Sequence, residues 1–313
     1  MKKTKISEIK VFAPATAANL ACGFDVFGLA LAAPGDFVQM RLNNSHAIRI
    51  LKISGDHGML SMNPDENTVS VSVRALLDKL EIKQGFDIIL RKKMPLGSGM
   101  GSSAASAVAG VFAANQLLGQ PFSKTELVRF AMEGERIACG SAHADNVGPS
   151  MLGGICLVRS NDPLDIISLP VPPQLFVVLV HPHINVLTRD SRAVLPAAVP
   201  LKAATSQWAN TAAFVAGLFN NDYSLIGKSV VDHVAEPHRA RLIPGFDEVK
   251  KAALENGALA CSISGSGPSV FALVKGEAGC QKLARAMRKG FSSLNIGSEV
   301  YISRVNKKGV SIV

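Results

Sequence analysis

Residues 95–106 read Pro95-Leu96-Gly97-Ser98-Gly99-Met100-Gly101-Ser102-Ser103-Ala104-Ala105-Ser106. The stretch follows a strand pattern and opens a run of small residues that is typical of a buried helix. Glycines at alternate positions allow positive φ angles and let the backbone come close to a ligand. Unpaired N–H groups at the start of the helix would face that ligand, with the positive end of the helix dipole behind them. The stretch therefore predicts an anion site, most naturally for a phosphate.

Other glycine motifs fit this stretch less well. A P-loop requires a lysine before its final serine or threonine, and no lysine stands there. A Rossmann fingerprint requires glycine where Ser102 stands. The glycine loop of protein kinases is accompanied by H-R-D and D-F-G motifs, which this sequence lacks. A tight turn that only packs the helix remains the alternative to a phosphate site.

Composition indicates a folded protein with a sizeable core. The chain has 313 residues, of which 48% are hydrophobic and 18% charged, which excludes a disordered or fibrous class and suggests two domains or one large one. The net charge of +9 comes from scattered basic residues such as Arg91-Lys92-Lys93. We interpret these groups chiefly as solvated faces and chain ends, and secondarily as attraction for a small anionic substrate.

Cysteine usage and hydropathy predict a soluble protein of the cytoplasm. The five cysteines form no C-x-x-C pair, and their odd number argues against a disulfide framework. The N-terminus lacks the apolar core of a secretory signal, and no stretch of 18 apolar residues predicts a membrane helix.

Strand and helix patterns alternate along the chain, which indicates a mixed α/β or α+β protein. Strands are expected at residues 9–13, 36–42, 48–53, 86–91, 153–158, 175–180, 259–263, 270–274 and 298–303. Helices are expected at residues 69–80, 102–118, 123–137, 203–219, 224–234, 246–256 and 277–289. Residues 160–174 contain four prolines and no convincing periodicity, so we expect a linker there.

Two further blocks accompany the glycine-rich stretch. The first is Ala13-Pro14-Ala-Thr-Ala-Ala-Asn19-Leu20-Ala-Cys-Gly23-Phe24-Asp25-Val-Phe-Gly28, and the second is Ser262-Ile-Ser264-Gly265-Ser266-Gly267-Pro268-Ser269. Together the three blocks resemble the motifs of the GHMP kinases, in the family's order. Within that superfamily the first block, residues 143–149 and residues 236–245 resemble the homoserine kinases, over essentially the whole chain. The sequence departs from the pattern at Ala21-Cys22 and at Met100.

The resemblance implies an α+β fold of two domains. Residues 1–165 would form an N-terminal domain like domain 2 of ribosomal protein S5, which carries the phosphate loop, and residues 166–313 a ferredoxin-like domain. The implied reaction is direct in-line transfer of a phosphoryl group from Mg²⁺-ATP to the side-chain hydroxyl of L-homoserine, in threonine biosynthesis. The implied partner is this small molecule, without nucleic acid or membrane, and family members suggest a homodimer.

Residue roles are implied by the same resemblance, position by position. The ATP-binding residues would be Pro95, Leu96, Gly97, Ser98, Gly99, Met100, Gly101, Ser102, Ser103, Ala104 and Ala105. The Mg²⁺ ligands would be the Ser103 hydroxyl and the Glu135 carboxylate, which are hard oxygen donors. The substrate-binding residues would be Asn19, Asp25, His143, Asp145, Asn146, Thr188, Arg192 and Arg239, with the two arginines on the carboxylate.

The catalytic residues would be Glu135, Asp145 and Asn146. No lysine stands in the first block to activate the alcohol, so either positioning and charge stabilisation suffice or Asp145 accepts the proton. Two alternative functions stay open. One is a GHMP kinase for another alcohol, such as shikimate or mevalonate. The other is a ligand sensor or an RNA-binding module, for which the basic pI of about 9.4 would be suited.

Overall fold

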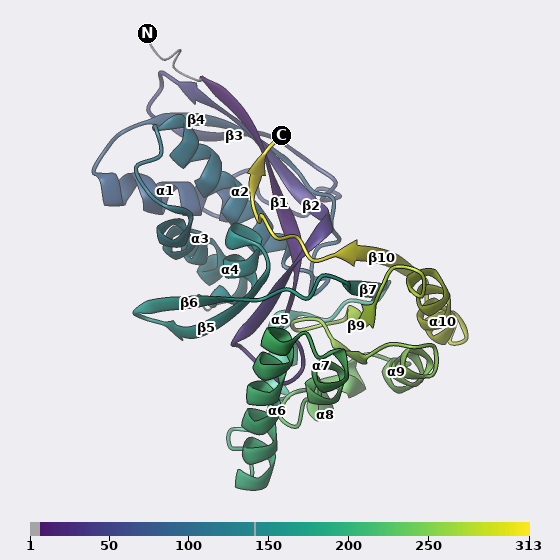
Figure 1. The fold of residues 1–313 in the computed structure, drawn as a ribbon. Helices are drawn as coiled ribbons and strands as arrows, with labels where there is room; N and C mark the ends of the chain where they lie inside the picture. Colours follow the sequence, from purple (N-terminus) through teal and green to yellow (C-terminus); the bar gives the residue numbers. More distant parts are fainter. Residues whose placement is uncertain (1–6, 141) are drawn as a thin grey trace.

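Two β-sheets organise the chain in this computed structural model, which describes residues 7–140 and 142–313 (Figure 1). The first sheet has seven strands, with β11, β1, β2, β4 and β3 in that order and the β5–β6 hairpin attached to β2. Its strands are β1 (Glu8–Ala18), β2 (Phe27–Asn43), β3 (Ile48–Ser54), β4 (Gly85–Arg91), β5 (Ile155–Asn161), β6 (Leu164–Leu169) and β11 (Ser311–Ile312). The pairing is antiparallel except between β3 and β4.

Four helices gather beside the first sheet (Figure 1). They are α1 (Thr68–Leu80), α2 (Ser102–Leu117), α3 (Lys124–Cys139) and α4 (Ala144–Leu152). Asn67 caps α1 by accepting from the backbone N–H of Val69, and Ser123 begins α3 with a capping box. Helix α2 is buried on almost every side, and its small residues allow the close packing that such a central helix requires.

The second sheet is antiparallel, with strands in the order β10, β7, β9 and β8. These strands are β7 (Leu175–Pro182), β8 (Ala260–Ile263), β9 (Val270–Lys275) and β10 (Ser298–Arg304). The remaining helices are α5 (Thr188–Ala193), α6 (Leu201–Asn220), α7 (Tyr223–Ser229), α8 (Glu236–Arg239), a 3-10 turn (Ala240–Leu242), α9 (Phe246–Glu255) and α10 (Cys280–Ser292). Across the described ranges, no helix combines the length and the apolar character needed to cross a membrane.

Strand β7 contributes to two hydrophobic cores and so connects the half of the molecule built on the first sheet with the half built on the second. Leu175, Val177 and Leu179 lie in the large core shared with the first sheet, whereas Phe176 and Val178 lie in a second core with residues of α9 and α10. Successive side chains of a strand point to opposite faces, so a strand buried on both faces is apolar throughout. The continuous apolar sequence of β7 follows from this position.

Most expected elements are confirmed, but the linker at residues 160–174 is wrong. Residues 164–169 form β6, which pairs with β5 across a short turn. The prolines lie at 163 and from 170 onward, so they border the strand and do not interrupt it. Helix α7 ends at Ser229, earlier than expected. Helices α4, α5 and α8 were not expected, because they are short and α4 contains Pro149.

The proposed boundary between residues 165 and 166 falls within β6, and both β5 and β6 belong to the first sheet through the pairing of β5 with β2. At the other end of the chain, β11 returns to that sheet and pairs with β1. The boundary itself stays a prediction.

Candidate active site

The three sequence blocks meet in space through backbone hydrogen bonds. In the first block, the N–H of Thr16 donates to the carbonyl of Met100 at 3.0 Å. From the third block, the N–H of Gly265 donates to the carbonyl of Ala18 at 3.2 Å, and the Ser264 hydroxyl donates to the carbonyl of Gly99 at 2.7 Å. The glycine-rich loop is therefore held between the first strand and the loop that joins β8 to β9.

The glycine-rich loop has the geometry of an anion site. Gly97, Gly99 and Gly101 all have positive φ, and Gly101 directly precedes α2 without a side-chain cap. The first N–H groups of α2 consequently face the loop. The hydroxyls of Ser98 and Ser102 are buried, and neither has a hydrogen-bond partner among the described residues. Such unsatisfied groups favour a ligand that carries oxygen acceptors.

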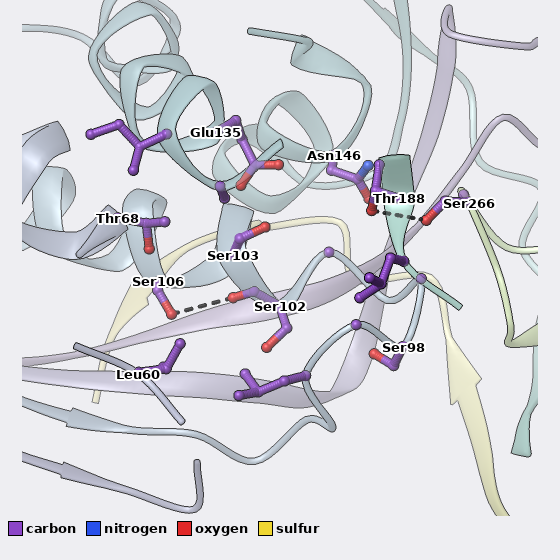
Figure 2. A pocket seen from close by; sticks show the side chains of 18 of the residues that line it. Leu60, Thr68, Ser98, Ser102, Ser103, Ser106, Glu135, Asn146, Thr188 and Ser266 are labelled. Atoms are coloured by element: carbon purple, nitrogen blue, oxygen red, sulfur yellow. Dashed lines mark hydrogen bonds between the residues drawn. The ribbon is translucent and has the colours of Figure 1, made fainter. Parts of the chain in front are cut away.

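A pocket of about 650 Å³ opens in front of this loop (Figure 2). The loop and the start of α2 form one wall, and Thr68, Glu135 and Asn146 contribute to the others. Residues from α5 and from the third block close the far end, including Thr188 and Ser266, whose hydroxyl oxygens are 3.3 Å apart. The pocket is thus built by both halves of the molecule.

The buried side chain of Lys92 holds the start of α2 in place. Its ammonium forms a buried ion pair with Asp36 and donates to the carbonyl of Ser102 and the hydroxyl of Ser106, both at 2.7 Å. Burial lowers the pKa of Lys92, and the Asp36 carboxylate opposes that effect. The interpretation of Arg91-Lys92-Lys93 as a solvated face is therefore wrong for Lys92, which is 4% exposed. Because alternate residues after β4 point inward, strand periodicity would have indicated its burial.

Ser103 and Glu135 offer two hard oxygen donors to the same pocket (Figure 2). Glu135 lies on α3 and is only 8% exposed. Across the described ranges no group of three or more His, Cys, Asp or Glu side chains could hold a metal ion by itself. A hydroxyl and one carboxylate suit Mg²⁺, which completes its octahedron with phosphate oxygens and water. This donor set fits the ion that the resemblance implies.

A second group of polar residues lies beside the pocket. Asp25 and Arg192 form a bidentate ion pair, with N–O distances of 3.0 and 3.1 Å. Asn19 orders the loop that carries Asp25, because its Oδ1 accepts from the N–H of Asp25 and its Nδ2 donates to the carbonyl of Gly265. Asn19 and Asp25 both have positive φ, a conformation that Asn and Asp tolerate better than most residues.

Arg239 approaches the same carbonyl from the other side. Its Nη1 donates to Gly265 at 3.0 Å and its Nε to the carbonyl of Ser191 at 3.1 Å, while Phe24 lies against the guanidinium at 5.2 Å. The side chain is 4% exposed, and burial lowers the pKa of its guanidinium. These contacts use two of its five donors and leave a preorganised cation next to Gly265, which lines the pocket.

Acidic groups concentrate at the start of α4. Burial, together with the charges of Asp25 and Glu135, raises the pKa of the Asp145 carboxyl to about 7, although Arg192 opposes the shift. His143 precedes the helix, and burial lowers its pKa. A carboxyl with so high a pKa can exchange a proton near neutral pH, which is a common property of functional sites.

The structure brings the predicted residues into two adjoining groups. Residues 96–99, 101–103, Glu135, Asn146 and Thr188 line the pocket, whereas Asn19, Asp25, His143, Asp145, Arg192 and Arg239 lie outside its lining. Two lining residues contact the second group: Asn146 directly follows Asp145 in α4, and the carbonyl of Gly265 accepts from Asn19 and Arg239. The other predicted ATP-binding residues do not line the pocket; they are Pro95, Met100, Ala104 and Ala105. Sequence reasoning missed Lys92 and assigned no role to Thr16, although Thr16 stood within the first block.

Comparison with known proteins places this architecture in a family. Residues 67–154 match the GHMP kinases N terminal domain, and residues 214–293 match the GHMP kinases C terminal domain. A homoserine kinase of Chlorobium phaeobacteroides (strain DSM 266) is 50% identical, with 97% of this chain and 99% of the relative covered. One from Xylella fastidiosa is 36% identical over 98% of this chain and 94% of the relative.

Solved structures agree with the sequence comparison. The crystal structure of homoserine kinase from Cytophaga hutchinsonii superposes with a TM-score of 0.97 at 55% identity, covering 100% of this chain and 99% of that one. Mevalonate kinase of L. major, in complex with R-mevalonate, gives a TM-score of 0.71 at 15% identity over 97% of this chain and 99% of that one, which shows the fold alone. The predicted fold class is thereby confirmed.

Proposed function

Because the chain belongs to the GHMP kinases, and among them to the homoserine kinase family, we propose that it transfers the γ-phosphoryl group of ATP to the side-chain hydroxyl of L-homoserine. The product is O-phospho-L-homoserine, an intermediate of threonine biosynthesis. The similarity to curated homoserine kinases extends over nearly the whole chain, and it includes both halves of the site.

One observation carries the choice of substrate. The phosphate-type loop opens toward a cluster with both charge signs, in which Asp25 and Asp145 lie near Arg192 and Arg239. An amino acid zwitterion needs an anion for its ammonium group and a cation for its carboxylate. Mevalonate and shikimate have a carboxylate but no ammonium group, so they would leave the acidic side of the cluster unpaired.

The reaction needs little covalent chemistry from the protein. The N–H groups at the start of α2 would hold the phosphates, and Ser103 and Glu135 would hold Mg²⁺, which neutralises charge that develops on the phosphoryl oxygens. Arg192 and Arg239 would fix the substrate's carboxylate, so that its hydroxyl reaches the pocket beside Asn146. Holding both reactants in line supplies a large part of the rate enhancement.

Two roles for Asp145 fit its raised pKa. Its carboxylate can bind the substrate's ammonium group, or it can accept the hydroxyl proton during transfer, since the best general bases have a pKa near the working pH. In both roles the ionised form is the active one.

A panel of alcohols tests the proposal directly. We expect ADP release in the presence of L-homoserine, and little release with shikimate, mevalonate or homoserine that lacks its amino group. Turnover of mevalonate or shikimate without turnover of homoserine would contradict the proposal. Filter binding to RNA at low and moderate salt tests the binding-protein alternative, since nucleic-acid affinity would fall steeply with salt.

We further propose a cytoplasmic location and a homodimer. The described cysteines Cys22, Cys156, Cys261 and Cys280 are buried thiols, which suits a reducing compartment. The homodimer follows from the family resemblance. Cell fractionation checks the location, and light scattering of the purified protein checks the mass of the particle.

A further inference from the structure

We propose that Thr16 is a positioning residue that holds the amide of Asn146 with its NH₂ group toward the reacting phosphoryl group. The inference rests on the proposed function, since it takes the pocket beside Asn146 as the place of phosphoryl transfer. Thr16 belongs to β1 and is fully buried, so it acts through its neighbours and not by touching a ligand.

Two hydrogen bonds place Thr16 between the phosphate loop and α4. Its backbone N–H donates to the carbonyl of Met100 at 3.0 Å, which ties β1 to the loop. Its hydroxyl donates to Oδ1 of Asn146 at 2.6 Å, across 130 positions of sequence. One residue thus connects the loop that would hold the phosphates with the amide that faces them.

The hydroxyl of Thr16 determines which end of the amide faces the pocket. Among the described residues its hydroxyl has no hydrogen-bond acceptor other than Asn146 Oδ1. If the amide were rotated by half a turn, its NH₂ group would donate to Thr16, and the buried hydroxyl would have nowhere to donate. A buried hydroxyl that loses its only acceptor destabilises the protein, so the observed orientation is favoured.

Gly101 brings the glycine-rich loop into close contact with this hydrogen-bonded pair. A Cβ at Gly101 would lie 2.0 Å from Thr16 Oγ1 and 2.9 Å from Asn146 Oδ1. The loop backbone therefore lies directly against the hydrogen-bonded pair. Gly101 also has positive φ, so both conformation and space require glycine here.

The orientation has a chemical consequence at the pocket. Oδ1 is occupied by Thr16, and in the described part of the chain Nδ2 has no hydrogen-bonded partner. Asn146 lines the same pocket as Ser103 and Glu135 (Figure 2), so its NH₂ group is the end available to a ligand. An NH₂ group donates to phosphoryl oxygens as their charge grows, whereas a carbonyl oxygen in that place would repel them.

Two variants of Thr16 separate the hydroxyl from the shape of the side chain. Thr16→Val keeps the branched shape but removes the donor, so we expect kcat to fall roughly 10- to 100-fold, less than the loss for deleting an oxyanion donor outright. The KM for ATP should change by less than about threefold, because the loop backbone is untouched. Thr16→Ser restores the hydroxyl and should stay within about threefold of the wild type. Equal losses in both variants, or wild-type kcat in Thr16→Val, would overturn the proposal.

A double-mutant cycle with Asn146→Ala tests the path through the amide. If Thr16 acts through Asn146, Thr16→Val should cost little further in the Asn146→Ala background. An undiminished loss there would mean that Thr16 acts by another route, and the proposal would fail.

An NMR measurement tests the orientation without any substrate. The side-chain NH₂ signals of Asn146 are assigned by their loss in Asn146→Asp. They should shift or broaden in Thr16→Val and stay in place in Thr16→Ser. Unchanged signals in Thr16→Val would refute the positioning role. Absence of homoserine turnover by the wild type would instead refute the proposed function, and the two failures are thus distinguishable.

Discussion

Two ionisable side chains of the site, Asp145 and Arg239, are buried, whereas such groups are usually exposed to water. Asp145 is buried near two other acidic groups, and Arg239 is buried against Phe24. Both situations cost free energy in the unliganded protein, because charges lose their hydration. A zwitterionic substrate would offset that cost at both ends, which is why single substitutions at these residues are informative.

Asp145→Asn should stabilise the protein while it impairs turnover. Burial raises the folded-state pKa of the Asp145 carboxyl to about 7, above the ordinary value of 3.8 for an aspartate. The folded protein therefore binds more protons than the unfolded chain between these values, and stability falls as pH rises through them. Asparagine cannot ionise, so the Tm gain over the wild type should be larger at pH 8 than at pH 5. Thermal unfolding at both pH values checks this.

The control for Asp145 is Asp78→Asn, an exposed carboxyl on α1. Asp78→Asn should have the same Tm as the wild type at both pH 5 and pH 8, and the same turnover. In the wild type, kcat/KM for homoserine should fall as pH drops below about 7, since the ionised carboxylate is the active form. A flat profile between pH 5.5 and 8 would remove Asp145 from the mechanism.

Arg239→Leu should lower kcat/KM for homoserine at least roughly 30-fold. Loss of one partner of a desolvated charge pair costs roughly 2–5 kcal/mol, and about 1.4 kcal/mol corresponds to tenfold. The compound 3-amino-1-propanol, which lacks the carboxylate, should be poor with wild type and lose little further. ATP affinity should barely change. Arg241→Leu is the matched control, because Arg241 is exposed two residues away. An equal loss of ATP and homoserine binding would show that Arg239 is no carboxylate anchor.

Glu135→Gln should raise the Mg²⁺ concentration needed for half-maximal turnover, and Ser103→Ala should do so to a smaller extent. The first change removes a negative charge as well as a good ligand, whereas the second removes only a neutral oxygen. Mg²⁺-dependent binding of ATP, followed by calorimetry, gives a readout besides activity. The neighbouring Glu133→Gln should behave as wild type, since Glu133 pairs with Arg136 at the surface. Unaltered metal dependence in Glu135→Gln would contradict the assignment.

At the scale of elements, the glycine-rich loop and the start of α2 together form the anion site. The loop supplies positive-φ glycines, and α2 supplies N–H groups at a start that no side chain caps. Lys92, which lines the pocket, forms a buried ion pair with Asp36 and holds the first turn of α2 through the carbonyl of Ser102. All three donors of the Lys92 ammonium are used by Asp36, Ser102 and Ser106, so Lys92 affects a phosphate through its charge and not by direct contact.

Gly101→Ala should lower ATP affinity at least about tenfold, whereas Gly119→Ala should not. Both glycines have positive φ, so both variants carry a backbone strain of roughly 1–2 kcal/mol and a lower Tm. Only at Gly101 would the new Cβ meet other atoms, since nothing lies within 4 Å of a Cβ at Gly119. Equilibrium ATP binding and thermal unfolding are measured on the same samples. Equal effects of the two variants on ATP binding would indicate that the loop is only a packing turn.

At the scale of the whole molecule, the site depends on contacts between the two sheets. The loop that follows β8 in the second sheet supports the phosphate loop, which follows β4 in the first. A Cβ at Gly99 would lie 2.4 Å from the carbonyl of Ser264, so the two loops are in direct contact. The large core also extends from β1 and β2 to β7 and β9, so the two halves pack on each other.

Ser264→Ala tests this coupling. The variant removes the hydrogen bond from the Ser264 hydroxyl to Gly99, which is worth roughly 1 kcal/mol. We expect a severalfold weaker affinity for ATP and a Tm lower by a few degrees. Ser292→Ala at the end of α10 removes a serine hydroxyl at the surface and should change neither. ATP binding by Ser264→Ala that equals wild type would mean that the second sheet does not support the phosphate loop.

The sequence by itself determined the glycine-rich loop at the start of α2, the family and most of the secondary structure. Each of these depends on interactions that are local in the chain: glycines that permit positive φ, a strand that leads into a small-residue helix, and apolar periodicity. Motif order then identified the superfamily, and the comparisons confirm it. Residues 160–174 misled the prediction, because prolines that border a strand look the same in sequence as prolines in a linker.

Only the tertiary structure decided which side chains face one another. Thr16 and Asn146 are 130 positions apart, and Lys92 and Asp36 are 56 apart, so no local pattern pairs them. The pKa of Asp145 likewise depends on burial and on charges that α3 and the first block bring close. Burial and long-range electrostatics are properties of the packed chain, because they arise when distant segments exclude water together.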